Sequence, residues 1–307
     1  MLQKTAQCAL EYGRQFIPQG AVADYIPELG KADPNQLGLC LFTKDGQKIM
    51  CGDVDQRFTI QSICKVISLA TALQCEGFDK VFAKVMMEPS GDAFNSILKL
   101  DLASNRPYNP MINAGAIEVV SMLTPRFTFE QLLEYARILC MDDDIVLDEA
   151  VYHSEKATGD RNRAIAYLLK SKGVLEGDEL KTVDLYFRMC SLSVNARSLA
   201  GLGLTIANGG VDPNNGVRLL DERVVRVVKT LMLTCGMYDG SGEFAVRVGI
   251  PAKSGVGGGI MGCVENRMGI GTYGPALDEK GNSIGGRQML EYLSRELHLH
   301  IFDSLNA

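Results

Sequence analysis

The stretch LGLCLFT at residues 37–43, followed by Asp45-Gly46 and KIMCG at 48–52, decides the fold of this chain. An apolar run, an Asp-Gly pair and a second short run are typical of two antiparallel strands joined by a tight turn. An isolated two-stranded hairpin is at best marginally stable in water, because it has nothing against which to bury its apolar face. We therefore expect this hairpin to pair with strands from elsewhere in the chain.

A matching pair of strand-like runs lies near the other end. GGIMGCV at 258–264 and RMGIGTYG at 267–274 flank Glu265-Asn266, which predicts a second hairpin. An amphipathic helix is expected at 284–297, where Met289, Leu290, Leu293 and Leu297 have helical spacing. The economical arrangement is one antiparallel sheet assembled from both chain ends and flanked by helices.

The middle of the chain is helical in character. A helical period of apolar residues starts at Ser62, and Gly77 provides a stop signal. Further helices are expected at 113–123, 129–140, 161–172, 193–208 and 221–235. The pattern predicts an α+β fold with a large helical insertion. We expect a single domain over 1–307, with the sheet in about 1–60 and 245–307 and the helical part in about 61–244.

The composition excludes several classes of protein. Of the 307 residues, 46% are hydrophobic and 22% charged, which is ordinary globular usage. The net charge of −6 argues against a nucleic-acid partner, and no apolar run has the length of a signal peptide or a membrane span. Nine cysteines without a C-x-x-C pair favour reduced thiols in the cytoplasm rather than disulfides or a metal site.

The segment FTIQSICKV at 58–66 contains S-x-x-K, formed by Ser62 and Lys65. Residues i and i+3 share a helix face, so we expect the lysine amine to lie beside the serine hydroxyl. A lysine can activate a serine nucleophile only when neutral, and therefore only if its pKa falls well below its ordinary value of about 10.4. Alone, the tetrapeptide also fits a helix cap followed by a surface lysine.

A second motif, KSGVGGG at 253–259, gives the first one its context. Serine acyl-enzymes combine S-x-x-K with a Lys-Thr/Ser-Gly triad on a strand. We expect Lys253 to supply a second cation that lowers the pKa of Lys65. The backbone N–H groups of Ser62 and Val256 would form an oxyanion hole. Together the motifs favour acyl transfer over a glycine-rich turn.

The chain resembles the serine-dependent glutaminases, which share the β-lactamase/DD-peptidase-like fold. The resemblance covers nearly the whole length, and it is carried by seven segments in one order. They are VADYIPELG (22–30), IQSICKV (60–66), NPMINAGAI (109–117), SEKATGDRNRAIAYLL (154–169), DLYFRMCSL (184–192), GMYDGSGEF (236–244) and KSGVGGGI (253–260).

The resemblance implies hydrolysis of free L-glutamine to L-glutamate and ammonia through a Ser62 acyl-enzyme. It implies catalytic roles for Ser62, Lys65, Tyr238 and Tyr186, with either tyrosine as the principal proton-transfer group. The implied substrate-binding residues are Tyr25, Gln61, Ser62, Asn113, Glu155, Asn162, Tyr186, Tyr238 and Val256. No cofactor or metal is expected, and a homo-oligomer, dimeric or tetrameric, is implied.

The chemistry of glutamine fits the residue types. Glu155 would bind the α-ammonium, and the amides of Asn113 and Asn162 would bind the α-carboxylate. A β-lactamase or D-Ala-D-Ala peptidase, or a non-catalytic glutamine-binding module, are the alternatives.

Three other signals are set aside. G-x-G-x-x-G at 269–274 is followed by Pro275 rather than a helix, so we interpret it as strand glycines. Asp142-Asp143-Asp144 is interpreted as a solvated loop or helix start, and His153 as structural.

Overall fold

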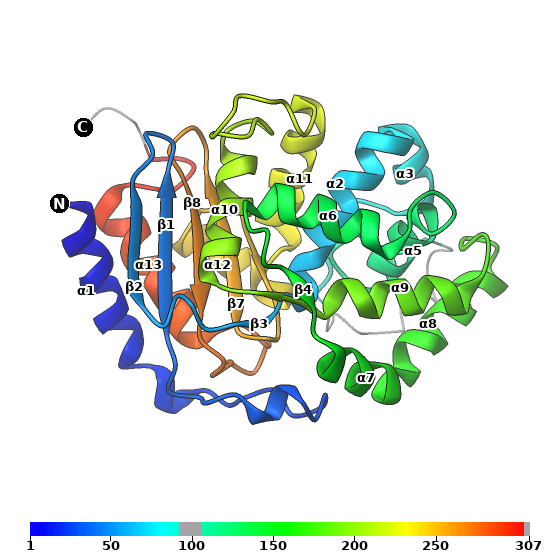
Figure 1. The fold of residues 1–307 in the computed structure, drawn as a ribbon, viewed down its shortest axis with the longest axis horizontal. Coiled ribbons are helices and arrows are strands. Elements are labelled where there is room, and N and C mark those ends of the chain that lie inside the picture. Colours follow the sequence, from blue (N-terminus) through cyan, green and yellow to red (C-terminus); the bar gives the residue numbers. More distant parts are fainter. Residues whose placement is uncertain (92–105, 304–307) are drawn as a thin grey trace.

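A computed structural model describes residues 1–91 and 106–303 (Figure 1). Its main sheet has five antiparallel strands in the order β2-β1-β8-β7-β6. β1 (Gly38–Thr43) and β2 (Lys48–Gly52) form the first predicted hairpin, and β7 (Gly259–Val264) and β8 (Met268–Tyr273) form the second. β1 pairs directly with β8, so the prediction of one sheet from both chain ends, within an α+β fold, is confirmed.

Helices cover both faces of this sheet. α1 (Leu2–Arg14) and α13 (Ile284–Leu297) lie on the outer face, while α10 (Ala196–Ala207) lies between the sheet and the remaining helices (Figure 1). Successive residues of a strand point to opposite faces. Thus Leu39 and Leu41 pack in the core with α1 and α13, whereas Cys40 and Phe42 pack in the core with α10.

The glycines of β8 let α10 approach the sheet closely. A Cβ atom at Gly271 would lie 1.9 Å from the carbonyl oxygen of Ala196, and one at Gly269 would lie 2.0 Å from the amide nitrogen of Leu204. Side chains at these positions would push the helix away from the strand. The G-x-G-x-x-G sequence is therefore a packing feature of a strand, as predicted.

The helical part surrounds α2 (Cys64–Glu76), whose residues 64–73 are all buried. A helix that is buried all round must have neighbours on every side. The other helices of this part are α3 (Phe78–Lys84), α5 (Asn113–Leu123), α6 (Phe129–Cys140), α7 (Glu149–Thr158), α8 (Asp160–Ser171), α9 (Glu179–Cys190) and α11 (Glu222–Cys235). The short helix α12 (Ser241–Arg247) instead places Phe244 in the core beneath the outer face of the sheet. In the described part of the chain no helix has the length and apolar character to span a membrane.

Two local expectations were wrong. Ser62 does not start the α-helix: it lies in a 3-10 turn, Gln61–Ile63, and α2 begins at Cys64. The helix expected from residue 193 begins at Ala196, because Leu192–Val194 form strand β5 and Asn195 caps the helix with its side chain. β5 joins β3 (Phe58–Thr59) and β4 (Val146–Leu147) in a small second sheet.

Candidate active site

The small second sheet fixes the backbone just before Ser62. β3 pairs with β5, and the Ile60 amide donates to the Leu192 carbonyl at 2.8 Å. On the other side lies the glycine-rich turn after strand β6 (Ala252–Ser254), where a Cβ at Gly257 would sit 2.4 Å from the Thr59 carbonyl oxygen. The two motifs, nearly two hundred positions apart, thus meet through backbone contact that only glycine permits.

Two site residues adopt a backbone conformation that is costly for side-chain-bearing residues. Gln61 has φ +47° and Tyr238 has φ +54°, both in the left-handed region. Strain of this kind persists where the surrounding structure imposes it, and it gathers at functional sites. Both residues are buried, and both flank Ser62: Gln61 in sequence, Tyr238 in space.

Seven of the predicted substrate-binding residues line one cavity of about 110 Å³. They are Tyr25, Gln61, Ser62, Asn113, Glu155, Asn162 and Tyr186. Tyr25 is half-exposed and borders the cavity on its solvent side, whereas Glu155 and Tyr186 are buried. α5, α7, α8 and α9 each place at least one residue in this wall, so side chains from five separate sequence segments converge.

Lys65 is fully buried, which excludes its interpretation as a surface lysine. Its amine donates to Asn113 Oδ1 at 2.7 Å and to the Met111 carbonyl at 3.2 Å. These are the acceptors of the Lys65 amine among the described residues, and the Ser62 hydroxyl is not one of them. Burial lowers the pKa of Lys65 to about 8, while Cys190, Cys64 and Glu155 act in the opposite direction.

Asn113 connects Lys65 to the cavity. Its side-chain oxygen accepts from Lys65 and, at 3.4 Å, from the Tyr186 hydroxyl. Its amide nitrogen donates to Asn162 Oδ1 at 3.0 Å. The side chain sits in the first turn of α5, where its position is fixed by the helix start. The cavity wall is therefore one hydrogen-bonded network rather than a set of separate side chains.

Tyr238 lies against the serine from the sheet side. The Ser62 side chain and the Val256 backbone both act on its hydroxyl and lower its pKa, but burial is the larger effect and the pKa remains above its usual value. At ordinary pH Tyr238 is therefore protonated. Its hydroxyl can pass a proton to or from a neighbouring oxygen or nitrogen without carrying a charge for long.

Lys253 lies on β6 beneath the Tyr238 ring, with its amine 4.4 Å from the ring centroid. The amine donates to the carbonyls of Gly236 at 3.0 Å and Ser254 at 2.6 Å. Burial, followed by the charge of Lys65, holds the pKa of Lys253 well below its ordinary value. The two amines disfavour each other's charge, because repulsion between two cations is mutual, but burial is the larger cause for each lysine.

Glu155 has the electrostatic character of a receptor for a cation. Burial raises its pKa to about 8, against smaller opposite effects from a Gln61 hydrogen bond and the charge of Lys65. Its Oε2 atom has no hydrogen-bond partner among the described residues. A buried carboxylate oxygen without a donor has a cost that a bound ammonium group would remove.

Sequence reasoning missed other residues of the cavity wall, chiefly Cys190 and Arg161. Cys190 is one helical turn beyond Tyr186, so the i, i+4 rule could have placed it on the same face. Arg161 precedes Asn162 in the sequence but gave no separate signal. His153 pairs with Glu149 at 3.7 Å on the exposed face of α7, and Asp142 binds Arg57 at 2.9 Å. Within the described ranges no cluster of residues could hold a metal ion.

Comparison with known proteins decides the family. The glutaminase family model matches residues 20–302. Glutaminase 2 of Clostridium perfringens is 52% identical over 297 residues, covering 95% of this chain and 97% of that protein, and the glutaminase of Fusobacterium nucleatum gives the same figures. The chain belongs to the glutaminase family.

Solved structures of glutaminases have the same fold as this chain. A probable glutaminase from Bacillus subtilis, complexed with 6-diazo-5-oxo-L-norleucine, has a TM-score of 0.88 at 38% identity, with 97% of this chain and 96% of that one covered. The probable glutaminase ybaS has a TM-score of 0.92 at 38% identity, with 98% and 99% covered. The resemblance drawn from the sequence is thus confirmed, and the chain is a glutaminase of the amidohydrolase class.

Proposed function

We propose that this glutaminase hydrolyses the side-chain amide of free L-glutamine through an acyl-enzyme on Ser62. The observation that carries the proposal is that Ser62 lines the cavity while the Tyr238 hydroxyl meets both the Ser62 side chain and the Val256 backbone, although Tyr238 and Val256 themselves line neighbouring cavities. Lys65, whose pKa burial lowers to about 8, follows Ser62 by three residues. A lysine with such a pKa is partly neutral near neutral pH, and a neutral amine can accept a proton.

The first half of the reaction transfers the glutamyl group to Ser62. The Ser62 oxygen attacks the side-chain carbonyl carbon of glutamine, and its proton passes towards Lys65, with Tyr238 or Tyr186 completing the path because Lys65 itself contacts Asn113. The backbone N–H groups of Ser62 and Val256 stabilise the oxyanion. The C–N bond then breaks, ammonia leaves with the returned proton, and the glutamyl group remains on Ser62 as an ester.

Water completes the cycle. It attacks the ester carbon, the Ser62 oxygen recovers a proton, and L-glutamate is released. The same groups assist this step in the reverse direction, as is usual for acyl-enzymes. No cofactor enters either step.

The cavity wall accounts for the choice of a free amino acid. Glu155, with an oxygen that lacks a partner, would bind the α-ammonium. Asn162 uses its oxygen to accept from Asn113, so its NH₂ group supplies the donors for the α-carboxylate. Tyr25 and Gln61 would enclose the side chain of the bound glutamine. Asn113 acts mainly through Lys65 and Tyr186, whose positions it fixes.

Replacement of Ser62 by alanine tests the nucleophile. We expect ammonia release from glutamine to fall to background while the protein remains folded. Ser68→Ala is the matched control, since Ser68, on α2, is likewise buried but in the described part of the chain donates only to the Cys64 carbonyl. The unmodified enzyme treated with 6-diazo-5-oxo-L-norleucine should carry the adduct on Ser62 in peptide mass spectrometry. Substantial turnover by the Ser62→Ala protein, or an adduct elsewhere, would refute the scheme.

The single-domain organisation and the homo-oligomeric state also remain proposals. One cooperative thermal transition followed by calorimetry would support the first. Light scattering coupled to size-exclusion chromatography measures the second directly.

A further inference from the structure

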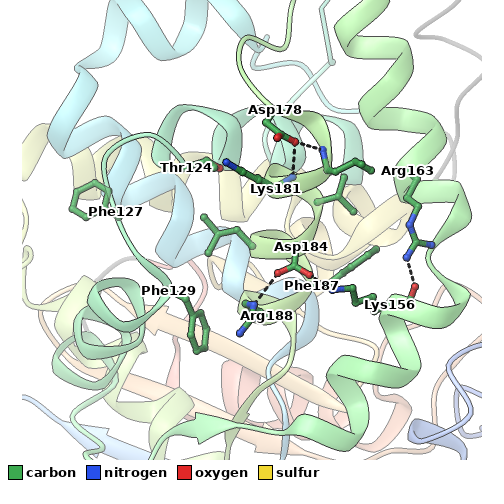
Figure 2. A pocket seen from close by; sticks show the side chains of 13 residues that line it. Thr124, Phe127, Phe129, Lys156, Arg163, Asp178, Lys181, Asp184, Phe187 and Arg188 are labelled. Carbon is green, nitrogen blue, oxygen red and sulfur yellow. Dashed lines mark hydrogen bonds and ion pairs between the residues drawn. The ribbon is translucent and has the colours of Figure 1, made fainter.

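A second cavity, of about 560 Å³, shares three helices with the wall of the substrate cavity (Figure 2). On each of α7, α8 and α9, a residue that lines the substrate cavity is followed in the chain by one that lines the second cavity. The pairs are Glu155 and Lys156, Asn162 and Arg163, and Tyr186 and Phe187. A molecule in the second cavity would thus touch the elements that position the substrate-binding side chains.

The carboxylates that line this cavity are already engaged. Asp184 accepts from Lys156 at 2.5 Å and from Arg188 at 2.9 Å, and these partners lower its pKa to about 2 (Figure 2). Asp178 caps α9, because its Oδ1 atom accepts from the backbone amides of Leu180 and Lys181. Asp184 is therefore balanced by two cations, and Asp178 is held at the start of the helix by backbone donors.

The lining cations outnumber the carboxylates. Lys156, Arg163, Lys181 and Arg188 face Asp178 and Asp184, which leaves two positive charges. The Lys181 side chain has no carboxylate within ion-pair distance among the residues that the structure describes. The partner of Arg163 is Asp160, which is 92% exposed and so weakly held.

The rest of the wall is apolar and largely aromatic. Phe127, Phe129 and Phe187 line it together with Leu180 and Leu185. The Arg188 guanidinium lies 5.6 Å from the Phe129 ring centroid, and that of Arg163 lies 5.7 Å from the Phe187 centroid. Flat rings bordered by guanidinium groups suit a planar ring that bears a negative charge.

We propose that this cavity binds a ring-bearing organic anion larger than an amino acid. Its volume falls in the range of small-molecule sites, roughly 300–1,000 Å³, and is several times that of the substrate cavity. The anionic group lies at Lys181 and Arg163, and the ring lies against Phe129 and Phe187. The site is separate from the hydrolytic chemistry, so it does not depend on Ser62 being the nucleophile.

Calorimetric titration of the full chain with 1-naphthyl phosphate, in saturating L-glutamate, tests the proposal. We expect saturable binding, with inorganic phosphate and neutral 1-naphthol each at least about tenfold weaker, because each lacks one of the two recognised features. Lys181→Gln should weaken binding of 1-naphthyl phosphate about five- to tenfold. Lys4→Gln, an exposed lysine on α1, should leave it unchanged.

Four results would overturn the proposal. They are absence of saturable binding, equal affinity for 1-naphthol, equal affinity for inorganic phosphate, and an unchanged affinity in a folded Lys181→Gln protein. Displacement of the probe by L-glutamate would also overturn it, since the probe would then occupy the substrate cavity.

Discussion

The helical side and the sheet side of Ser62 offer different chemistry. The helices contribute polar side chains to the cavity wall: the amides of Asn113 and Asn162, the carboxyl of Glu155 and the hydroxyl of Tyr186. The sheet side contributes mainly backbone, at Val256, with Lys253 bound to main-chain carbonyl groups. We infer from this difference that the helices would recognise the substrate, whereas the sheet side would supply rigid groups near the reacting bond.

The two buried lysines show the contrast most sharply. Lys65 donates to a side chain that belongs to the cavity network, and its pKa of about 8 allows it to lose a proton under ordinary conditions. Lys253 donates only to two main-chain carbonyls in the bonds that the structure describes, and its ring contact is with Tyr238. We infer that Lys65 exchanges protons, while Lys253 holds Tyr238 and the strand in place.

The largest expected effect comes from removing these two amines one at a time. Lys65→Met should lower kcat about 10²–10⁴-fold, since it deletes the proton acceptor. Lys253→Met should lower kcat by only about tenfold, because it removes a supporting contact. Steady-state ammonia assays on both folded variants check this order. An equal loss in the two proteins would remove the distinction between the two sides.

The second largest effect should come from removing the charge of Glu155, the proposed partner of the α-ammonium group. Glu155→Gln should raise KM for glutamine about 10–100-fold with a smaller change in kcat, because a buried charge-assisted contact contributes about 1.5–3 kcal/mol. Glu149→Gln is the control on the exposed face of the same helix. A fall in kcat with KM unchanged would place Glu155 in the chemistry instead of in recognition.

The pH profile tests both groups together. The neutral form of Lys65 and the ionised form of Glu155 each require loss of a proton, and burial brings both pKa values to about 8. We therefore expect kcat/KM to rise with pH, to bend near pH 8 and to level off above it, with a slope approaching two on the acidic side. Glu155→Gln should reduce that slope to one. A profile already flat at pH 6 would contradict these assignments.

A smaller effect concerns stability in the helical part alone. Glu118 on α5 is buried, and burial raises its pKa to about 8. Between the ordinary pKa of about 4.5 and 8, the unfolded chain releases this proton and the folded chain keeps it, so the carboxyl destabilises the fold increasingly as pH rises. Glu118→Gln should therefore increase the free energy of unfolding at pH 8.5 by an amount on the order of 2 kcal/mol, with a higher melting temperature than the parent. At pH 5 the difference should be small.

Thermal melts at the two pH values measure this difference. Glu279→Gln, at an exposed position, is the control and should change neither melt. A Glu118→Gln gain of equal size at both pH values would point to packing rather than ionisation.

Local patterns predicted much of the fold because the physics involved is local. The hairpin at 37–52 was predicted from two short strand-like runs around an Asp-Gly turn, and helices α5 and α6 were predicted at the bounds that the structure gives. The helix at Leu2–Arg14 was overlooked, although Ala6, Ala9, Leu10 and Gly13 are buried with helical spacing. Strand β5 could not be distinguished from the start of the next helix, since the strands that pair with it, β3 and β4, come from distant segments of the chain.

The candidate site divides in the same way. The sequence by itself determined the family and named seven of the residues that line the cavity, because seven ordered segments carry the family resemblance. Only the tertiary structure decided that Lys65 donates to Asn113, and that Lys65 and Lys253 are both buried and disfavour each other's charge. Burial and hydrogen-bond partners depend on which distant segments fold against one another, and no spacing along the chain records them.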